Sequence, residues 1–149
     1  MVEVLVYIVE HYSITEPYQR RLQLARHLEE LGFDTKQINE AFDWLLRLFY
    51  MVNQGSYQLN SSISHRVYAA EEQNLLTIEV RGLILTLENR HAISATQREI
   101  IIDRLLSITD TEVTLVVAKL VILLVLYITK TRLPNIWNEK LPKGMHTMH

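Results

Sequence analysis

The sequence predicts a mainly α-helical protein, a single-domain bundle of five or six helices, with or without one small β-hairpin around residues 50–68. Three observations predict this fold class. Apolar residues recur every three or four positions along most of the chain, as they do in amphipathic helices. The chain has only 4 glycines and 3 prolines with which to build tight turns. Its 149 residues are the length of one ordinary domain, which can bury a core without disulfides or metals.

The first part of the chain contains two or three predicted helices. Residues 4–12 are apolar and rich in β-branched side chains, so they fit either a short helix or a buried strand. A helix over residues 17–31 follows, because its proline suits the first helical position, and Gly32 is placed to end it in the left-handed conformation. The Asp-to-Gln spacing of residues 34–37 is typical of a capping box, and it predicts a helix that continues to Phe49.

The middle of the chain changes character and then returns to helix. Residues 50–68 alternate between polar and apolar, and Gln54–Gly55 is suited to turn a small hairpin. Residues 71–90 carry apolar side chains on two faces, so this helix is expected to be widely buried. Gly82 inside a helix costs about 1 kcal/mol relative to alanine. It therefore predicts that another backbone packs closely there, and that Gly82→Leu destabilises the protein by overpacking.

The last two predicted helices begin at recognisable caps. Ser94, with Gln97 three residues later, is typical of a capping box and opens the first of them. Thr109 with Glu112 is expected to cap the second, which covers the very apolar residues 113–128.

Residues 113–128 are apolar enough to raise the question of a membrane span. Sixteen helical residues are about 24 Å long, which is short of a hydrocarbon core about 30 Å thick. Glu112, Lys119 and Lys130 fall within about 20° of one direction on the helical wheel, and so form one thin polar line. This pattern favours the central helix of a soluble core with one edge at water, and no membrane span.

Helical periodicity ends at Thr129. Residues 1–129 are therefore expected to form one helical domain, and residues 130–149 a basic C-terminal tail that is partly docked. The apolar side chains suited to this docking are Ile136, Trp137 and Leu141.

The composition excludes several classes of function. The chain has no cysteine, which excludes disulfides and thiolate metal sites and suits a reducing cytosol. The net charge of −2 is distributed as −3, −2 and +3 over residues 1–50, 51–111 and 112–149, so no broad positive field draws phosphates. The 6 histidines show no metal-binding spacing within a predicted helix, and the isolated glycines form no phosphate-binding loop. These features predict a non-enzymatic protein with no catalytic residue, cofactor or metal.

Charged residues on the helices predicted over 75–90 and 96–107 form the candidate partner-binding surface. The apolar faces of these helices account for the core, so the charges are expected at the surface. Exposed ion pairs contribute only about 0–1 kcal/mol to stability, so docking of an unidentified protein partner is a second role for them. An Arg98→Ala, Arg104→Ala double variant is expected to fold normally and lose this partner. The candidate residues are Arg81, Glu88, Arg98, Glu99, Asp103 and Arg104.

Residues 22–59 suggest a different function. The order of helix, LGF turn, helix and hairpin matches a winged helix, with residues 36–48 as recognition helix and the hairpin as wing. The net charge of the proposed recognition helix does not suit DNA binding. The segment from Asp34 to Phe49 contains two basic and three acidic residues, whereas a DNA-reading helix is basic. We therefore expect a cytoplasmic protein-interaction or regulatory module, with nucleic-acid binding as the alternative.

Eight stretches of the sequence carry a family resemblance. They are VLVYIVEHY near the start, the LGF of 31–33, INEAFDWL, RVYAAEE at 66–72, RGLILTLE at 81–88, QREIIIDRLL at 97–106, AKLVILLVLYI at 118–128 and GMH at 144–146. In this order they resemble the Smg family, small bacterial proteins of unassigned biochemical function. Ala69–Ala70 departs from the Thr-Pro often found there and lacks a helix cap, and Leu120 replaces a common Trp. The resemblance implies a cytoplasmic bacterial protein and carries over no established activity.

Overall fold

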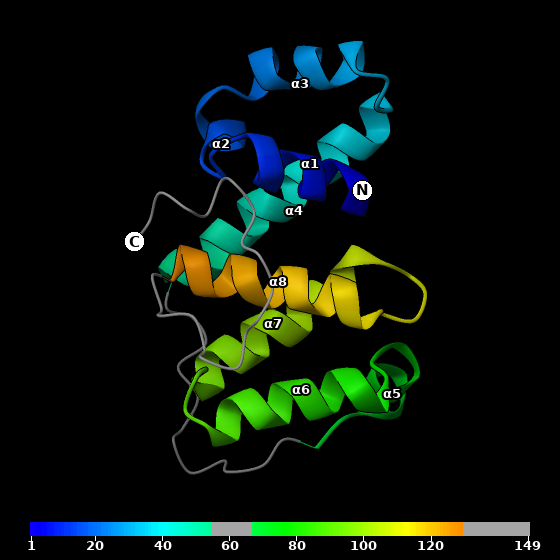
Figure 1. Ribbon diagram of the computed structural model, residues 1–149, viewed down its shortest axis with the longest axis vertical. Coiled ribbons are helices and arrows are strands. Elements are labelled where there is room, and N and C mark those ends of the chain that lie inside the picture. Colours follow the sequence, from blue (N-terminus) through cyan, green and yellow to red (C-terminus); the bar gives the residue numbers. More distant parts are fainter. Residues whose placement is uncertain (55–66, 130–149) are drawn as a thin grey trace. The chain divides into compact units, whose positions relative to one another are not determined.

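The computed structural model describes residues 1–54 and 67–129. These residues form eight helices and no strand, so the prediction of a mainly α-helical fold is confirmed (Figure 1). The prediction of five or six helices is wrong for the described residues, because two short helices interrupt stretches that were expected to be continuous. The helices are α1 (Val2–His11), α2 (Glu16–Gln19), α3 (Arg21–Glu30), α4 (Thr35–Gln54), α5 (Ala70–Leu75), α6 (Ile78–Asn89), α7 (Ala95–Ile108) and α8 (Leu115–Ile128).

The chain divides into two compact units. The described residues up to Phe49 form the first unit, and those from Tyr50 onward form the second. A single domain over residues 1–129 stays a prediction, since each unit is described by itself. The tail predicted for residues 130–149 lies outside the described residues.

In the first unit, the pattern of buried residues explains the secondary structure of residues 4–12. They form helix α1, in which Val4, Leu5, Ile8 and Val9 are buried. The last three of these residues follow Val4 by one, four and five positions, and this spacing places all four side chains on one side of a helix. The strand alternative for this segment is therefore wrong.

The helix predicted over residues 17–31 is two helices, α2 and α3. Pro17 lies in the first turn of α2, and the chain bends at Arg20, whose φ of −132° and ψ of 42° are not helical. Gly32 ends α3 with a φ of 100°, as predicted, which a residue with a side chain rarely adopts. The amide nitrogen of Phe33 donates to the carbonyl oxygen of Leu28 at 3.1 Å, which completes a Schellman-type cap.

Helix α4 is longer than expected, because its buried stripe continues beyond Phe49. Leu45, Leu48 and Met51 are buried at intervals of three residues, so residues 50–54 prolong the helix. The hairpin predicted around residues 50–68 is therefore wrong for residues 50–54. Its remaining turn and second strand fall largely on residues 55–66, which lie outside the described residues.

In the second unit, α6, α7 and α8 lie side by side and each contacts the other two (Figure 1). Before α6, the chain pairs with the segment before α8, where the amide nitrogen of Val113 donates to the carbonyl oxygen of Leu75 at 2.8 Å. Leu76 and Val113 form a parallel bridge at this point. Leu75 ends α5, and so the helix expected over residues 71–90 is two helices.

Side-chain caps begin three helices of the second unit. The predicted capping box of α7 is confirmed: Ser94 Oγ accepts from the Gln97 amide at 3.1 Å, and Gln97 Oε1 accepts from the Ser94 amide at 2.8 Å. Thr77 caps α6. The cap expected for the apolar helix is wrong, since Thr109 ends α7 and Thr114 caps α8 instead, with its Oγ1 3.3 Å from the Val117 amide.

Helix α8 is a core helix along most of its length. Residues 121–127 are all buried, and Lys119 is half-buried. Its first turn differs, because Val116 is 78% exposed. Among the described helices, none is both long and apolar enough to cross a lipid bilayer.

Candidate functional site

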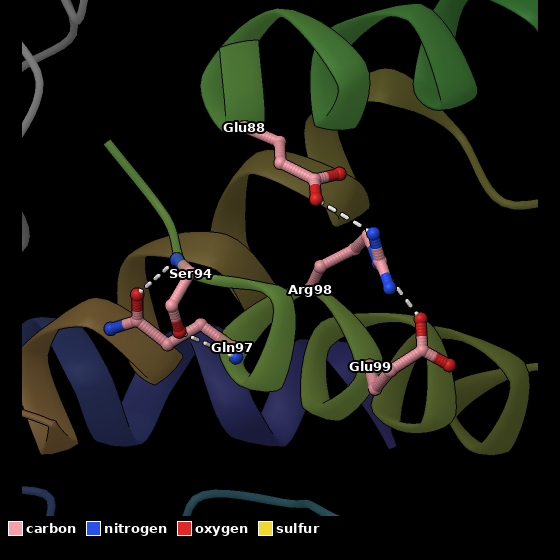
Figure 2. A network of polar contacts seen from close by, with 5 residues as sticks. All are labelled: Glu88, Ser94, Gln97, Arg98 and Glu99. Carbon is pink, nitrogen blue, oxygen red and sulfur yellow. Dashed lines mark hydrogen bonds and ion pairs between the residues drawn. The ribbon is translucent and has the colours of Figure 1, made fainter. Parts of the chain in front are cut away.

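The central polar feature of the second unit is Arg98, which lies in the first turn of α7 beside the capping box (Figure 2). Its side chain is only 2% exposed. One terminal nitrogen, Nη1, donates to Glu88 Oε2 of α6 at 2.6 Å, and Nε donates to Glu99 Oε2 at 2.9 Å. The guanidinium thus joins α7 to α6 through Glu88, and it also binds the neighbouring carboxylate of Glu99 within α7.

The electrostatics of this cluster keep the arginine charged. Burial alone lowers the pKa of the Arg98 guanidinium, because it disfavours the charged form. Hydrogen bonds and Coulomb attraction from Glu88 and Glu99 outweigh burial, so the pKa of Arg98 lies above its ordinary value. A guanidinium that donates hydrogen bonds to two carboxylates stabilises the packing around it, and it also holds those carboxylates in fixed positions.

The second arginine of α7, Arg104, is also buried, at 6% exposed. Its Nε and Nη2 donate to Asp103 Oδ2 at 3.0 Å and 2.8 Å. The prediction that these arginines lie at the surface is therefore wrong. The physical reason is that α7 contacts both α6 and α8, so two of its sides face neighbours and its arginines are enclosed with its isoleucines.

A hollow of about 250 Å³ opens on the outer side of α6. Arg81 contributes to its wall: its Nε donates to the carbonyl oxygen of Leu76 at 3.0 Å, and its guanidinium lies 5.8 Å from the centre of the Tyr68 ring. The hollow brings together Arg81, Glu88 and Arg98, while Asp103, Arg104 and Glu99 do not line it. The lining residues are Tyr68, Ile78, Arg81, Gly82, Ile84, Leu85, Glu88 and Arg98.

Two aliphatic side chains at this hollow are exposed rather than buried. Ile78 is 78% exposed and Leu85 is 48% exposed. The helix over residues 71–90 was predicted to be buried on both of its apolar faces, and that prediction is wrong for the face that carries these two residues. The buried contacts of α6 are made by Val80, Ile84 and Leu87, of which Ile84 also lines the hollow. A spacing of four and then three residues places Ile78, Gly82 and Leu85 on one face, so the sequence showed this stripe but not that it is exposed.

Gly82 has open space around it, which contradicts the expected close approach of another backbone. A Cβ atom built on Gly82 would meet no heavy atom within 4 Å, apart from its own neighbours along the helix. The overpacking expected for Gly82→Leu is therefore wrong.

We expect Gly82→Ala to raise the free energy of unfolding by about 0.5–1 kcal/mol, because alanine has the better helix propensity and nothing obstructs its methyl group. Urea denaturation of dilute protein would measure this change. Gly32→Ala is the matched control and should destabilise, since Gly32 has a φ of 100°. A lower stability for Gly82→Ala would contradict an open site.

The first unit has a smaller hollow of about 190 Å³, formed by α2, α3 and α4. At its edge Arg21 pairs with Asp43 at 2.9 Å and lies over the Phe42 ring, 5.4 Å from its centre. Within residues 1–54 and 67–129, no three His, Asp or Glu side chains are grouped so that they could hold a metal ion.

Comparison with known proteins places the chain in a family. Residues 1–144 match the family model described as "Protein of unknown function (DUF494)". The chain is 36% identical to the "Protein Smg homolog" of Chromobacterium violaceum over 98% of this chain and 96% of that protein. It is 32% identical to the one of Methylococcus capsulatus over 97% and 96% of the two chains. No solved structure matches it. The chain therefore belongs to the Smg family, which the resemblance of its short stretches also indicates.

Proposed function

We propose that this Smg-family protein is a non-enzymatic protein-interaction module of the cytoplasm, with a regulatory role, and that it binds its partner through the outer side of α6. We call this surface the α6 docking face. It consists of Ile78, Arg81, Gly82, Leu85 and Glu88. The cysteine-free composition is compatible with a reducing compartment.

The observation that supports this proposal is the outward apolar stripe beside a hollow. Ile78 and Leu85 are exposed two helical turns apart, and open space lies at Gly82 between them. Isolated exposed aliphatic residues are common, but a contiguous set around a hollow with charged edges is typical of a protein-binding groove. Burial of such residues by a partner yields roughly 25 cal/mol per Å² of apolar area. The geometry suits an amphipathic helix laid along α6.

Arg98 has a supporting role in this proposal. It is too buried to form the contact surface itself, but its 2.6 Å bond holds the Glu88 carboxylate at one end of the docking face. A fixed charge at the rim sets the register of a partner and favours one orientation over the other. Arg81 supplies a positive charge on the same face, and its side chain is held in place by its hydrogen bond to the Leu76 carbonyl oxygen.

We expect Leu85→Lys to abolish capture of the partner from a bacterial lysate, because it places a charge in the apolar stripe. The side chain is exposed, so the free energy of unfolding should change by no more than about 0.5 kcal/mol. The matched control is Leu22→Lys, at a residue of the first unit that is 78% exposed. Quantitative mass spectrometry of the captured proteins is the readout.

The comparison between the two lysine variants decides the proposal. A partner that Leu22→Lys retains and Leu85→Lys loses would support the α6 docking face. The same set of proteins on wild type and on Leu85→Lys would show that this face is not the binding site. This comparison replaces the Arg98→Ala, Arg104→Ala variant, because both arginines are buried and their removal would disturb folding.

Nucleic-acid binding through residues 22–59 is a second candidate, favoured by the order of α3, the turn at Gly32 and α4. The charges of α4 count against it. Lys36 lies 3.9 Å from Glu40, and Asp43 is paired with Arg21. A labelled DNA duplex tested at low and high salt separates the two functions, since phosphate contacts weaken steeply with salt. Absence of any shift at low salt would eliminate this candidate.

A further inference from the structure

We propose that the occupant of the α6 docking face is the same face of a second copy of this chain, with the two α6 helices antiparallel about a twofold axis. This inference rests on the proposed function, because it names the partner of the surface assigned there. Three features of the face support a second copy: a matching projection and hollow, a matching pair of charges, and a spacing that satisfies both at once.

The projection and the hollow are Leu85 and Gly82. Leu85 extends from the helix and is 48% exposed, and nothing lies within 4 Å of the position that a Gly82 Cβ would occupy. A twofold axis midway between these two positions places Leu85 of each copy over Gly82 of the other. The contact forms twice, as it must in an isologous interface. A glycine at the crossing also allows the two backbones to approach closely.

The charges are Arg81 and Glu88, which lie seven residues apart on the same face. An antiparallel pair places Arg81 of each copy beside Glu88 of the other, whereas a parallel pair would place like charges together. Arg81 uses Nε for the Leu76 carbonyl oxygen, and Glu88 uses Oε2 for Arg98. A guanidinium has five N–H donors and a carboxylate has about four acceptor sites, so both groups have capacity for an intermolecular bond.

The two requirements agree in their spacing. The axis that pairs Leu85 with Gly82 lies at position 83.5 along the helix, and the axis that pairs Arg81 with Glu88 lies at 84.5. At about 1.5 Å per residue these axes differ by about 1.5 Å, which is a shift of about 3 Å between the two helices and within the reach of the long arginine and glutamate side chains. An unrelated helix would match this face only if it happened to carry the same four kinds of group in the opposite order. A second copy of α6 in the antiparallel direction always presents them in that order.

The expected dimer is weak. Helix α6 has 12 residues and so is about 18 Å long. One pair of such helices buries less than the roughly 1,200 Å² at the low end of specific stable interfaces. We therefore expect association that depends on concentration, with monomers in dilute solution.

A cysteine cross-linking experiment tests the geometry directly, because the 149-residue sequence contains no cysteine of its own. In the proposed dimer the two copies of position 85 lie close to the axis, with Cα atoms roughly 4–7 Å apart, which is within the range of a disulfide. Leu85→Cys should therefore form an interchain disulfide under mild oxidation. The matched control is Ile78→Cys, which is more exposed but has its two copies roughly 16–20 Å apart along the axis, and so should remain uncross-linked.

Analytical ultracentrifugation of the full chain gives a second, independent readout. Wild-type protein should show a dimer that increases with concentration, and Gly82→Leu, which fills the hollow, should weaken association by tenfold or more. Equal cross-linking of both cysteine variants would indicate random collision and would overturn the proposal. A monomer at every concentration, with no cross-linking at position 85, would also overturn it.

The failure of this inference can be distinguished from the failure of the proposed function. If Leu85→Lys still loses a captured protein while purified protein stays monomeric, the docking face binds a different protein and the second copy is wrong. If Leu85→Lys loses nothing and Leu85→Cys does not cross-link, both proposals are wrong.

Discussion

Replacement of Arg98 by alanine is expected to lower the free energy of unfolding by about 3 kcal/mol, the lower end of the range for a broken buried ion pair. The side chain is 2% exposed and joins two carboxylates, and alanine would leave both without their cation. The lower end applies because the Glu88 and Glu99 side chains are 19% and 20% exposed and can be partly hydrated in the variant.

Urea denaturation of Arg98→Ala measures this loss, with Arg26→Ala as the matched control. Arg26 is an exposed arginine of α3, so its removal should change stability by no more than about 0.5 kcal/mol. Arg98→Lys should recover only part of the loss, because an ammonium lacks the planar fork that reaches two carboxylates. A similar, small effect for both alanine variants would contradict the buried position of Arg98.

The pH dependence of this contribution follows from the direction of the pKa. A basic group whose pKa is raised by folding stabilises the folded state at every pH below its pKa in the unfolded chain. This stabilisation is lost only as the pH rises through the pKa of the group in the folded state. The pKa of Arg98 is raised above its ordinary value, which already lies well above pH 9. The loss caused by Arg98→Ala should therefore be the same at pH 6 and at pH 9, as far as the protonation of Arg98 is concerned.

Leu124→Ala in α8 is expected to lower the free energy of unfolding by about 2–5 kcal/mol, through lost transfer energy and the cavity that remains. Leu124 is fully buried, in the part of α8 where every residue from 121 to 127 is buried. The matched control is Val116→Ala in the same helix. Val116 is 78% exposed, so this change should stay within about 0.5 kcal/mol.

The comparison of these two α8 variants tests whether the apolar helix is the centre of a water-soluble core. Thermal and urea denaturation without detergent are the measurements. Equal small effects at both positions would contradict a packed core around α8. An effect at Val116 as large as that at Leu124 would instead show that the first turn of α8 is buried in solution.

The sequence alone was sufficient where a structure depends on neighbouring residues. The capping box of Ser94 and Gln97 and the left-handed end of α3 at Gly32 were both predicted correctly. Each needs only a side chain or a backbone angle within about five residues, and local chemistry determines these. Local patterns gave a wrong prediction where two of them conflicted. Residues 50–54 alternate between polar and apolar like a strand, but burial of Met51 prolongs helix α4.

Only the tertiary structure decided which faces are buried. Helical periodicity shows that α6 has two apolar stripes, but it cannot say which one meets a neighbour. Contacts with α7 and α8 bury Val80, Ile84 and Leu87 and leave Ile78 and Leu85 exposed. The same contacts enclose Arg98, because α7 has neighbours on two sides. The sequence therefore determined the fold class, some of the helix ends and the family, while the candidate docking face depended on how distant segments pack together.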